Sequence, residues 1–497
     1  MNIDVDVVVV GAGPTGLLLA GDLARAGVSG AVLERRAGQS NLTRAFAVHA
    51  RTLEQLDARG VADELVATGT PEKTLRFLDR AQLRLPRLPS RFPYVLITPQ
   101  YETERVLEER ARSLGADIRY GAEVTGLARF PDRVEVIVRS DGQPEHLVRA
   151  RYVVGADGMH STVRTALGMP FPGRAVVRSV MLADVRLAEA PPDTLTVNAT
   201  GHAFALIAPF GDGWYRVIAW QRDNQPAEDT PVSLEEVADG ARQALGTDYG
   251  MHDPRWMSRF HSEERQVPRY RDGRVLLAGD AAHVHSPAGG QGMNTSIQDA
   301  ANLGWKLAAA VNGWAPDGLL DTYHAERHPV GRQVLRTSGA LLRVGLTGPP
   351  AIVAARNILA AAATRTPFAP RFLAGALSGL SISYPAPRGA HPLTGRRVAD
   401  LPLTGGRRLY EALRPGRFLL ASAPGAIPSG TLPAGYGDRV DTVEIARPTR
   451  TVALIRPDAY IAWAHGPRGA SDPAPDADRA PQLIDALARW CGTPAPV

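Results

Sequence analysis

The pattern of apolar and polar positions divides the chain into regions of different character. Residues 5–10, VDVVVV, are apolar apart from Asp6 and end in a glycine-rich turn. A predicted helix over residues 14–26 and a second apolar strand over residues 31–34 follow. Continuous rather than alternating hydrophobicity is typical of a parallel strand that is covered on both faces. The opening of the chain therefore predicts a strand–helix–strand unit.

Apolar strands that close on glycine return twice, at "ARYVVGADG" (150–158) and at "GRVLLAGD" (273–280). Before the first of these, the pattern predicts a helix over residues 101–114 and short strands at 117–120 and 134–138. From about 176 to 270, β-rich stretches such as "HAFALIAPF" and "GWYRVIAWQ" are separated by turns. These stretches predict an inserted antiparallel sheet.

After the strand in "GRVLLAGD" (273–280), the pattern predicts mainly helices to about residue 380. The Pro- and Gly-bearing stretch 383–397 then predicts a linker. Beyond it, "GRFLLAS", "TVALIRP" and "AYIAWA" are typical strands, and "APQLIDALARWC" is typical of a closing helix. The order predicts a small C-terminal α/β domain.

Composition excludes several classes of protein. The 497 residues carry a net charge of +5, and Lys73 and Lys306 are the only lysines. The arginines are scattered among acidic residues without a basic run, so the charge does not predict nucleic-acid binding. A single cysteine, Cys491, excludes an intramolecular disulfide framework, and a cytoplasmic location is expected.

Neither of the two most apolar runs of the chain predicts a membrane segment. The first apolar run lacks a basic flank and predicts a buried strand rather than a signal peptide. The later run at 349–364 contains Arg356 and falls short of the roughly 20 residues that span a bilayer. It is interpreted as a buried or partner-facing helix.

The stretch "GAGPTG" predicts a dinucleotide site. Gly11 makes a tight turn, Gly13 admits a pyrophosphate to the backbone, and Gly16 lets the helix pack on the strand. Glu34 ends the second strand and can accept the ribose hydroxyls of an adenosine. An acidic residue there favours FAD or NAD over NADP. The alternative is a tight turn with a purely structural role.

Three segments together resemble the fingerprints of a known family. GAGPTG, the Gly155–Gly158 stretch "GADG" and Gly279-Asp280 are similar in order and spacing to the FAD-dependent aromatic hydroxylases, the para-hydroxybenzoate and phenol hydroxylase group. The stretch "TYHAERHPVG" (322–331) is also similar to that family's pattern. The resemblance spans residues 5 to about 335. "TRAFAVHARTLEQLDARG" (43–60) and the C-terminal domain look most like the hydroxylases of aromatic polyketides.

The resemblance implies an α/β fold with four regions. Residues 1–175 and 271–390 would form a Rossmann-like FAD-binding domain, the second part with a helical region. Residues 176–270 would be an inserted antiparallel β-sheet domain for the substrate. Residues 391–497 would be a thioredoxin-like domain without the redox cysteines.

The glycine-rich stretch from Gly279 to Asn294 has a physical role in this reading. Reduced flavin is negatively charged, and a helix beginning near Gly289 to Asn294 offers N–H donors and a partial positive charge. Asp280 would accept a ribityl hydroxyl, and Pro287 would form a rigid wall beside the ring. An ordinary glycine loop that caps a helix is the alternative.

The resemblance also implies individual roles. Arg44 and Gln100 would lie at the pyrophosphate and ribityl chain, and Asp157 would link cofactor binding to reductant use. The alternative for Arg44 is a surface ion pair, and that for Gln100 is a polar group at the start of a helix. The alternative for Asp157 is a residue that forms a turn. The predicted cofactor contacts are Gly11, Gly13, Pro14, Thr15, Gly16, Glu34, Arg35, Arg44, Gln100, Asp157, Gly158, Gly279, Asp280, Pro287, Gly290, Gly292, Met293 and Asn294.

Candidate catalytic residues are Pro287, His283 and Arg44, although a bond from His283 to a loop carbonyl is an alternative. Candidate substrate contacts are Phe204, Leu206, Trp220, Phe46 and His49, and core packing is the alternative for the first three. Phe46-Ala47 departs from the Leu-Gly common in similar sequences, which changes the expected pocket there. No metal site is predicted.

The implied activity is an FAD-dependent monooxygenase. NAD(P)H would reduce the flavin in a transient encounter, since no second G-x-G-x-x-G follows a strand. Oxygen would add to give a C4a-hydroperoxyflavin, which hydroxylates a polycyclic aromatic, polyketide-type metabolite. A Baeyer–Villiger oxygenase, a flavin dehydrogenase or oxidase, and a non-catalytic binding protein are the alternatives. A monomer or homodimer is expected, with no nucleic acid or membrane partner.

Overall fold

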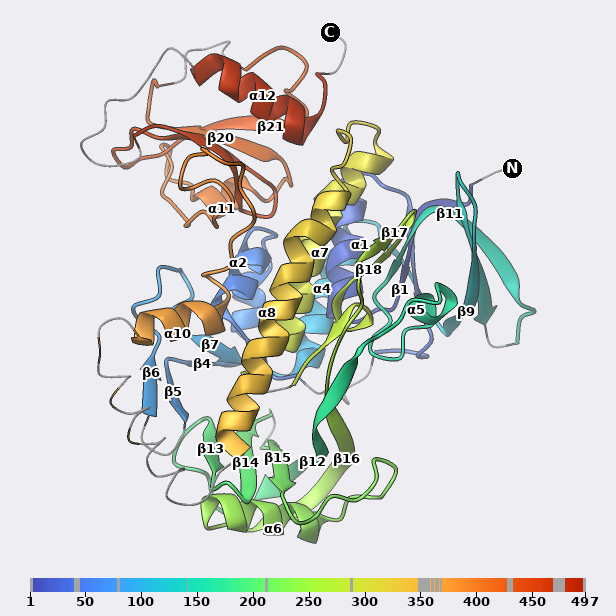
Figure 1. Ribbon diagram of the computed structural model, residues 1–497, viewed down its shortest axis with the longest axis vertical. Coiled ribbons are helices and arrows are strands. Elements are labelled where there is room, and N and C mark those ends of the chain that lie inside the picture. The colour runs from blue at the N-terminus through green and yellow to red at the C-terminus, as the bar shows by residue number, and fades with distance from the viewer. Residues whose placement is uncertain are drawn as a thin grey trace.

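The computed structural model describes residues 3–39, 45–77, 81–140, 142–210, 213–286, 289–346, 369–426, 432–467 and 479–494, together with positions 358, 362 and 366 (Figure 1). Arg44 and Pro287 lie outside the described residues, as does almost all of the apolar run at 349–364. Within the described ranges, no helix is both long enough and apolar enough to cross a membrane.

An eight-stranded sheet forms the centre of the larger part of the molecule. Its main path is β17 (Arg271–Asp272), β18 (Val275–Leu277), β11 (His146–Gly155), β1 (Val5–Val10), β2 (Gly30–Glu34) and β8 (Asp117–Tyr120), and β10 (Val134–Ser140) and β9 (Ala122–Arg129) continue from β11. Strand β1 pairs in parallel with both β2 and β11, so the predicted strand–helix–strand unit is confirmed. The apolar run is buried on both faces, as its continuous hydrophobicity predicted.

Helices cover this sheet. The helices that pack together beside β1 are α1 (Pro14–Arg25), α4 (Gln100–Ser113) and α7 (Gly292–Val311). The long helix α8 (Asp321–Leu346) crosses α7 and runs towards the second sheet (Figure 1). The shorter helices of this part are α2 (Ala50–Asp57), α3 (Ala62–Val66), α5 (Thr162–Ala166), the 3-10 turn η1 (Gly279–Ala281) and α10 (Ala369–Ser378).

The second sheet has six strands with antiparallel neighbours, which confirms the predicted antiparallel sheet. In order they are β13 (Thr196–Ala199), β14 (Ala203–Pro209), β15 (Tyr215–Gln221), β12 (Gly173–Leu187), β16 (Met251–Gln266) and β19 (His283–Val284). Helix α6 (Leu234–Leu245) covers one face of this sheet. Strand β19 was not predicted; it comes from the glycine-rich stretch and pairs with the end of β16.

Two small sheets connect the large ones. They are formed by β3 (Ala47–Val48), β7 (Val95–Ile97) and β4 (Thr70–Glu72), and by β5 (Thr74–Phe77) and β6 (Ala81–Arg84). Strand β3 lies directly after the sequence "RAF" and leads into α2.

The C-terminal region has its own four-stranded sheet. Its order is β21 (Val440–Glu444), β20 (Phe418–Ser422), β22 (Val452–Ile455) and β23 (Ile461–His465), accompanied by α11 (Leu409–Ala412) and α12 (Arg479–Cys491). Only β20 and β21 pair in parallel. Burial raises the pKa of the Cys491 thiol, which suits a core residue rather than a redox centre. The thioredoxin-like assignment and the domain boundaries stay predictions.

A buried ion cluster joins α1, α4 and the end of α2. The carboxylate of Asp22 lies 2.5 Å from Arg59 Nη2 and 2.9 Å from Arg110 Nη2. Burial alone would raise the pKa of Asp22, but the arginines around it lower that pKa far below its ordinary value. The cluster is therefore a charged unit that holds three helices against the first sheet.

Replacing Asp22 by Asn should lower the free energy of unfolding by about 3–5 kcal/mol, because buried arginines lose their counter-charge. Because the folded-state pKa is depressed, this contribution is present above the unfolded pKa of about 4 and is lost as the pH falls below it. Urea unfolding at neutral and acidic pH measures both effects. The exposed control Asp63→Asn should behave like wild type, and equal midpoints for Asp22→Asn and wild type would contradict the assignment.

Candidate active site

The first fingerprint forms a turn in which backbone segments approach closely. Gly11 has a φ of +102°, and an added Cβ would lie 2.5 Å from the carbonyl oxygen of Ala156. An added Cβ on Gly16 would lie 2.0 Å from the carbonyl oxygen of Gly11. Gly13 differs, because its added Cβ would meet no described atom within 4 Å. Two glycines thus pack the turn, and the third leaves backbone open to a ligand, as expected for a pyrophosphate.

Glu34 stands at the end of β2 beside this turn. Its carboxylate accepts hydrogen bonds from the backbone N–H of Ala12 (2.8 Å), the backbone N–H of Arg36 (2.9 Å) and Arg36 Nε (3.0 Å). Burial opposes ionisation, but the hydrogen bonds from Arg36 and from Ala12 lower the pKa of Glu34. Arg36 Nη2 also donates to Glu34 Oε2 at 3.4 Å. A carboxylate has about four acceptor positions, so a ribose hydroxyl would take the place of this longest hydrogen bond.

The arginine that supports Glu34 is Arg36, which sequence reasoning missed. The predicted contact Arg35 is exposed, while Arg36 turns back to Glu34 and to the carbonyl oxygen of Ala12 at 3.3 Å. The E-R-R run offered both arginines, and only the backbone course after β2 distinguishes them. Adjacent side chains at the end of a strand point to opposite sides.

Gln100 belongs to the same polar network. It begins α4, its Oε1 accepts a hydrogen bond from the backbone N–H of Ala45 at 3.2 Å, and its Nε2 donates to Glu104 at 2.7 Å. Arg36 lies 3.7 Å from the other oxygen of Glu104. Gln100 therefore anchors the backbone directly after the undescribed segment that contains Arg44.

The second fingerprint lies against the first. Asp157 Oδ2 accepts a hydrogen bond from the backbone N–H of Val163 at 3.1 Å, while its Oδ1 is buried without a hydrogen-bond partner in the described part of the chain. Burial raises the pKa of Asp157, against the bonds from Ser161 and Val163 that lower it. Gly158 has a φ of +79° and faces open space. The orphaned oxygen and the open glycine suit a site that a ligand completes.

The third fingerprint closes on the first helix. An added Cβ on Gly279 would lie 2.8 Å from Thr15 Oγ1 and 3.1 Å from Ser296 Oγ. Asp280 is exposed beside them, and Ser296 Oγ lies 3.5 Å from its carboxylate. Pro14, Thr15 and Gly279 thus lie at one end of the predicted cofactor site, and Asp280 is placed where it can accept a hydroxyl.

We call the described residues 279–286 and 289–294 the glycine loop. His49 and Asn294 hold its second half: His49 Nε2 lies 2.8 Å from the carbonyl oxygen of Gly289, and Asn294 Oδ1 accepts the backbone N–H of His49 at 2.8 Å. Asn294 Nδ2 donates to the carbonyl oxygens of Ala47 (2.9 Å) and Gly290 (2.7 Å). The loop is therefore tied to strand β3 by side-chain amide and imidazole groups.

His49 is a neutral imidazole in this position. Burial lowers its pKa to about 4, more than the carbonyl oxygens of Gly289 and Gly290 raise it. Because a carbonyl oxygen only accepts, Nε2 carries the proton and Nδ1 is a bare acceptor. That Nδ1 is buried without a hydrogen-bond partner in the described residues.

His283, on β19, lies in a buried charge cluster. Its Nε2 is 2.6 Å from Asp299 Oδ2, and Asp299 Oδ1 is 2.6 Å from Arg327 Nε. The backbone N–H of Gly279 donates to the same Asp299 oxygen at 3.2 Å. Burial opposes ionisation of Asp299, but Arg327 and His283 lower its pKa. The structure thus gives His283 a carboxylate partner rather than the loop carbonyl that sequence reasoning considered.

Helix α7 begins at Gly292, with Met293 buried behind it in the core. The first N–H groups of a helix have no intrahelical acceptor and carry a partial positive charge. That this helix end faces the negatively charged ring of the flavin stays a prediction.

Three of the candidate substrate residues, Phe204, Leu206 and Trp220, share one face of the six-stranded sheet. Phe204 pairs with Trp220, and Leu206 pairs with Ile218, which pairs with Leu182 of β12. These side chains lie opposite the face that α6 covers and form an apolar cluster with Phe260 and Phe46. We call this the open face. Its described members are Val180, Leu182, Phe204, Leu206, Ile218, Trp220, Trp256, Ser258 and Phe260.

A buried ion pair closes one end of the open face. Arg216 and Asp184 pair across β15 and β12, with Arg216 Nε 2.5 Å from Asp184 Oδ1. The guanidinium lies 4.1 Å from the Phe210 ring centroid and 5.1 Å from that of Trp256. Neither residue was singled out in the sequence, because their pairing depends on strand register.

A Glu34→Gln substitution should weaken FAD binding about tenfold to a hundredfold, because a charge-assisted hydrogen bond to a ribose hydroxyl becomes a neutral one. Fluorescence titration of the apoprotein with FAD measures this affinity. Glu109→Gln, on the exposed side of α4, is the matched control and should bind FAD like wild type. Unchanged affinity in Glu34→Gln would remove Glu34 from the site.

Comparison with known proteins agrees with this geometry. A family model described as "FAD binding domain" matches residues 4–338, and one described as "Aromatic-ring hydroxylase, C-terminal" matches residues 391–494. A rifampicin monooxygenase from Streptomyces venezuelae is 42% identical over 468 residues, which cover 92% of this chain and 95% of that protein.

Two further proteins are similar over nearly the whole chain. The structure of an anhydrotetracycline hydroxylase from Streptomyces rimosus has a TM-score of 0.86 and 40% identity, covering 99% of this chain and 100% of that one. A dialkyldecalin synthase from Streptomyces rugosporus is 34% identical over 503 residues, 98% of this chain and 99% of that protein. The resemblance inferred from the fingerprints is confirmed. The chain belongs to the FAD-binding aromatic-ring hydroxylases and is an FAD-dependent aromatic monooxygenase.

Proposed function

We propose that this enzyme uses NAD(P)H and O2 to hydroxylate a fused polycyclic aromatic metabolite of the polyketide type. Bound FAD, once reduced, supplies the activated oxygen atom. The observation that carries the substrate class is the open face, an extended apolar surface with polar atoms near both ends. Relatives named for rifampicin and anhydrotetracycline support the same class.

The open face lies next to the glycine loop. Phe46 packs against the open face and also against a second apolar cluster that contains Ile97 and Ala374. The next residue, Ala47, is held by Asn294, and its Cβ would lie 3.1 Å from an added Cβ on Gly290. Phe46 thus connects the apolar wall to the predicted flavin position. A ring placed between them would be sheltered from water, which protects an oxygenating cofactor.

Two polar atoms of the open face are buried without a hydrogen-bond partner in the described residues, Trp220 Nε1 and Ser258 Oγ. Buried polar groups without partners are rare in folded proteins, and a bound ligand is one explanation. In the sheet register the two residues are two strands and two positions apart, roughly 12 Å between Cα atoms. This spacing suits oxygen substituents at the two ends of a fused ring system and exceeds a single phenol ring.

The chain's own residues then have separate tasks. Glu34, Asp157 and the backbone at Gly13 hold the nucleotide, and the start of α7 stabilises negative charge on the ring. The open face orients the substrate by its flat apolar surface, with the Trp220 indole N–H as a donor to an oxygen substituent. His49 Nδ1 and the undescribed Arg44 and Pro287 stay candidates for contacts near the ring.

A substrate screen tests the proposal directly. Fused polycyclic phenols and quinones should stimulate NADPH or NADH oxidation, whereas single-ring phenols should not. With labelled O2, one labelled oxygen atom should enter the product as a hydroxyl group, which mass spectrometry and NMR identify. Label from water, a ring-expanded lactone, or a carbon–carbon bond formed without oxygen uptake would each exclude hydroxylation.

Substitution of the polar atoms tests the substrate orientation. Trp220→Phe and Ser258→Ala should each raise KM about fivefold to tenfold, because one hydrogen bond to the substrate is worth about 1 kcal/mol. FAD affinity should not change. Trp463→Phe, in the C-terminal sheet, controls for loss of an indole and should leave KM unchanged. Wild-type KM in both open-face variants would show that the substrate lies elsewhere.

A further inference from the structure

The turn between β22 and β23 is buried, although it joins two strands. Arg456, Asp458, Ala459 and Tyr460 are each at most 2% exposed. Ala459 has a φ of +59°, a left-handed conformation that residues with a Cβ rarely adopt. Such a conformation persists where its surroundings hold it, often at functional positions. We call residues 456–460 the docking turn.

The docking turn binds α7 and α8 of the FAD-binding part. Arg456 makes a two-pronged ion pair with Glu326 of α8, at 2.6 and 2.9 Å. Asn302 Nδ2 of α7 donates to Asp458 Oδ2 at 3.2 Å, and Asp458 Oδ1 accepts Arg456 Nε at 2.9 Å. The Arg456 guanidinium also lies 4.9–5.2 Å from the ring centroids of Trp490, Tyr384 and Trp305. Two domains thus share one buried charge network.

The same turn binds α2. The backbone carbonyl oxygen of Asp458 accepts hydrogen bonds from Arg51 Nη2 and Gln55 Nε2, both at 2.8 Å. The Arg51 guanidinium lies 4.7 Å from the Tyr460 ring centroid. These contacts fix two successive turns of α2 against the C-terminal domain.

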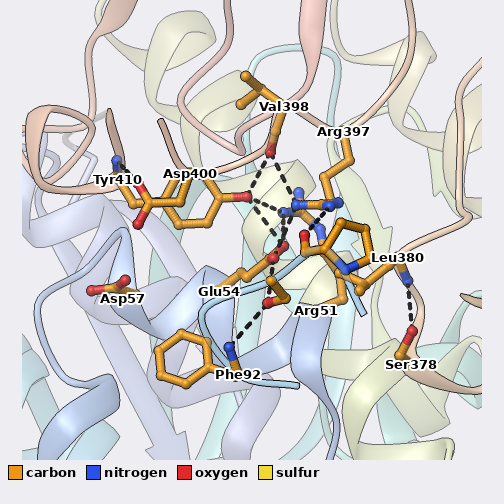
Figure 2. Close-up of polar contacts among 12 residues, drawn as sticks. Arg51, Glu54, Asp57, Phe92, Ser378, Leu380, Arg397, Val398, Asp400 and Tyr410 are labelled. Atoms are coloured by element: carbon orange, nitrogen blue, oxygen red, sulfur yellow. Dashed lines mark hydrogen bonds and ion pairs between the residues drawn. The ribbon is translucent and has the colours of Figure 1, made fainter. Parts of the chain in front are cut away.

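A second buried centre reinforces this end of α2. Figure 2 shows Glu54 surrounded by Arg51, Arg397 and Tyr410. Its carboxylate lies 3.1 Å from Arg51 Nη1, 2.9 Å from Arg397 Nη1 and 3.1 Å from the Tyr410 hydroxyl. Arg397 and Tyr410 come from the C-terminal region. This region therefore holds α2 by a charged guanidinium and a neutral hydroxyl together.

The helices that receive the docking turn are the helices that hold the glycine loop. His49 is the residue directly before α2, and it contacts Gly289 and Asn294. Arg327, next to Glu326 on α8, holds Asp299 and donates to the carbonyl oxygen of Thr295 at 3.1 Å. Its Nη1 lies 3.3 Å from the hydroxyl of Tyr384, whose ring packs at 4.1 Å on Tyr460.

We infer that the docking turn positions the glycine loop for FAD. The C-terminal domain would then take part in cofactor binding through α2, α7 and α8, with Asp458 and Tyr384 as positioning residues. A turn that served only to attach the domain would not need contacts with both α2, which follows His49, and α8, which carries Arg327. The physical basis is that buried hydrogen-bonded charges fix helix positions more narrowly than apolar contacts alone.

Asp458→Asn tests the inference in the full-length chain. The amide keeps the size of the side chain and the backbone carbonyl but removes the charge that pairs with Arg456. The FAD dissociation constant should rise about tenfold, the effect expected of a substitution that acts through a packed network. Backbone amide hydrogen exchange should quicken over residues 289–294 and stay at the wild-type rate in the six-stranded sheet.

Arg414→Met is the matched control. Arg414 also crosses between the domains, with Nη2 3.5 Å from Asp57 at the far end of α2, but it does not contact the docking turn. Its loss should leave FAD affinity and loop exchange unchanged.

A milder variant keeps the test decisive. Tyr384→Phe removes only the hydroxyl that Arg327 contacts, and it should weaken FAD binding and quicken loop exchange in the same direction as Asp458→Asn. If either variant folds and loses only unfolding stability, while FAD affinity and loop exchange match Arg414→Met, the docking turn merely attaches the domain and the inference is overturned.

Discussion

The carboxylate of Asp299 is the group on which the arrangement of the site depends. It joins the backbone of Gly279, the ring of His283 and the guanidinium of Arg327, and all of these are buried. Each partner belongs to a different element: the 3-10 turn η1, strand β19 and helix α8. Arg327 pairs with one oxygen of the carboxylate, and the His283 ring and the Gly279 N–H contact the other, so the buried charge of Asp299 has a partner at each oxygen. Removing any member would leave a buried group without its counterpart.

The many arginines of the chain have a structural role in the described part of the protein. Buried arginines pair with Asp22, Glu54, Asp184, Asp299 and Glu326 at the junctions between sheets, helices and the C-terminal domain. A guanidinium offers several donors in a fixed plane and stays charged when buried, so it can serve two or three acceptors at once. Burial lowers the pKa of Lys306 to about 8, although Glu326 opposes the change. An ammonium group is thus less suited to such positions.

The same scaffold supports proteins with different reactions. Relatives over the whole chain include monooxygenases and a dialkyldecalin synthase. The fingerprints around the nucleotide site define the cofactor, but they say little about what is placed beside it. In this chain the substrate surface that we propose is the open face with Trp220 and Ser258, which the strand register of the six-stranded sheet assembles. On this proposal, substrate choice depends on residues that are far apart in the sequence.

The sequence by itself determined the parts that depend on near neighbours. The strand–helix–strand opening, the antiparallel middle and the roles of Gly11 and Gly16 follow from local hydrophobicity and from backbone space, and the comparisons and the structure agree with them. Cofactor and family followed from three such local patterns.

Tertiary structure decided the rest. Only the fold shows that Arg36, and not Arg35, contacts Glu34, and that His283 contacts Asp299. Only the fold shows that part of the glycine loop forms strand β19. Only the fold buried the turn 456–460 against three helices of another domain. These outcomes depend on which distant charges meet, and a buried charge is stabilised by its partner's position in space rather than by its neighbours along the chain.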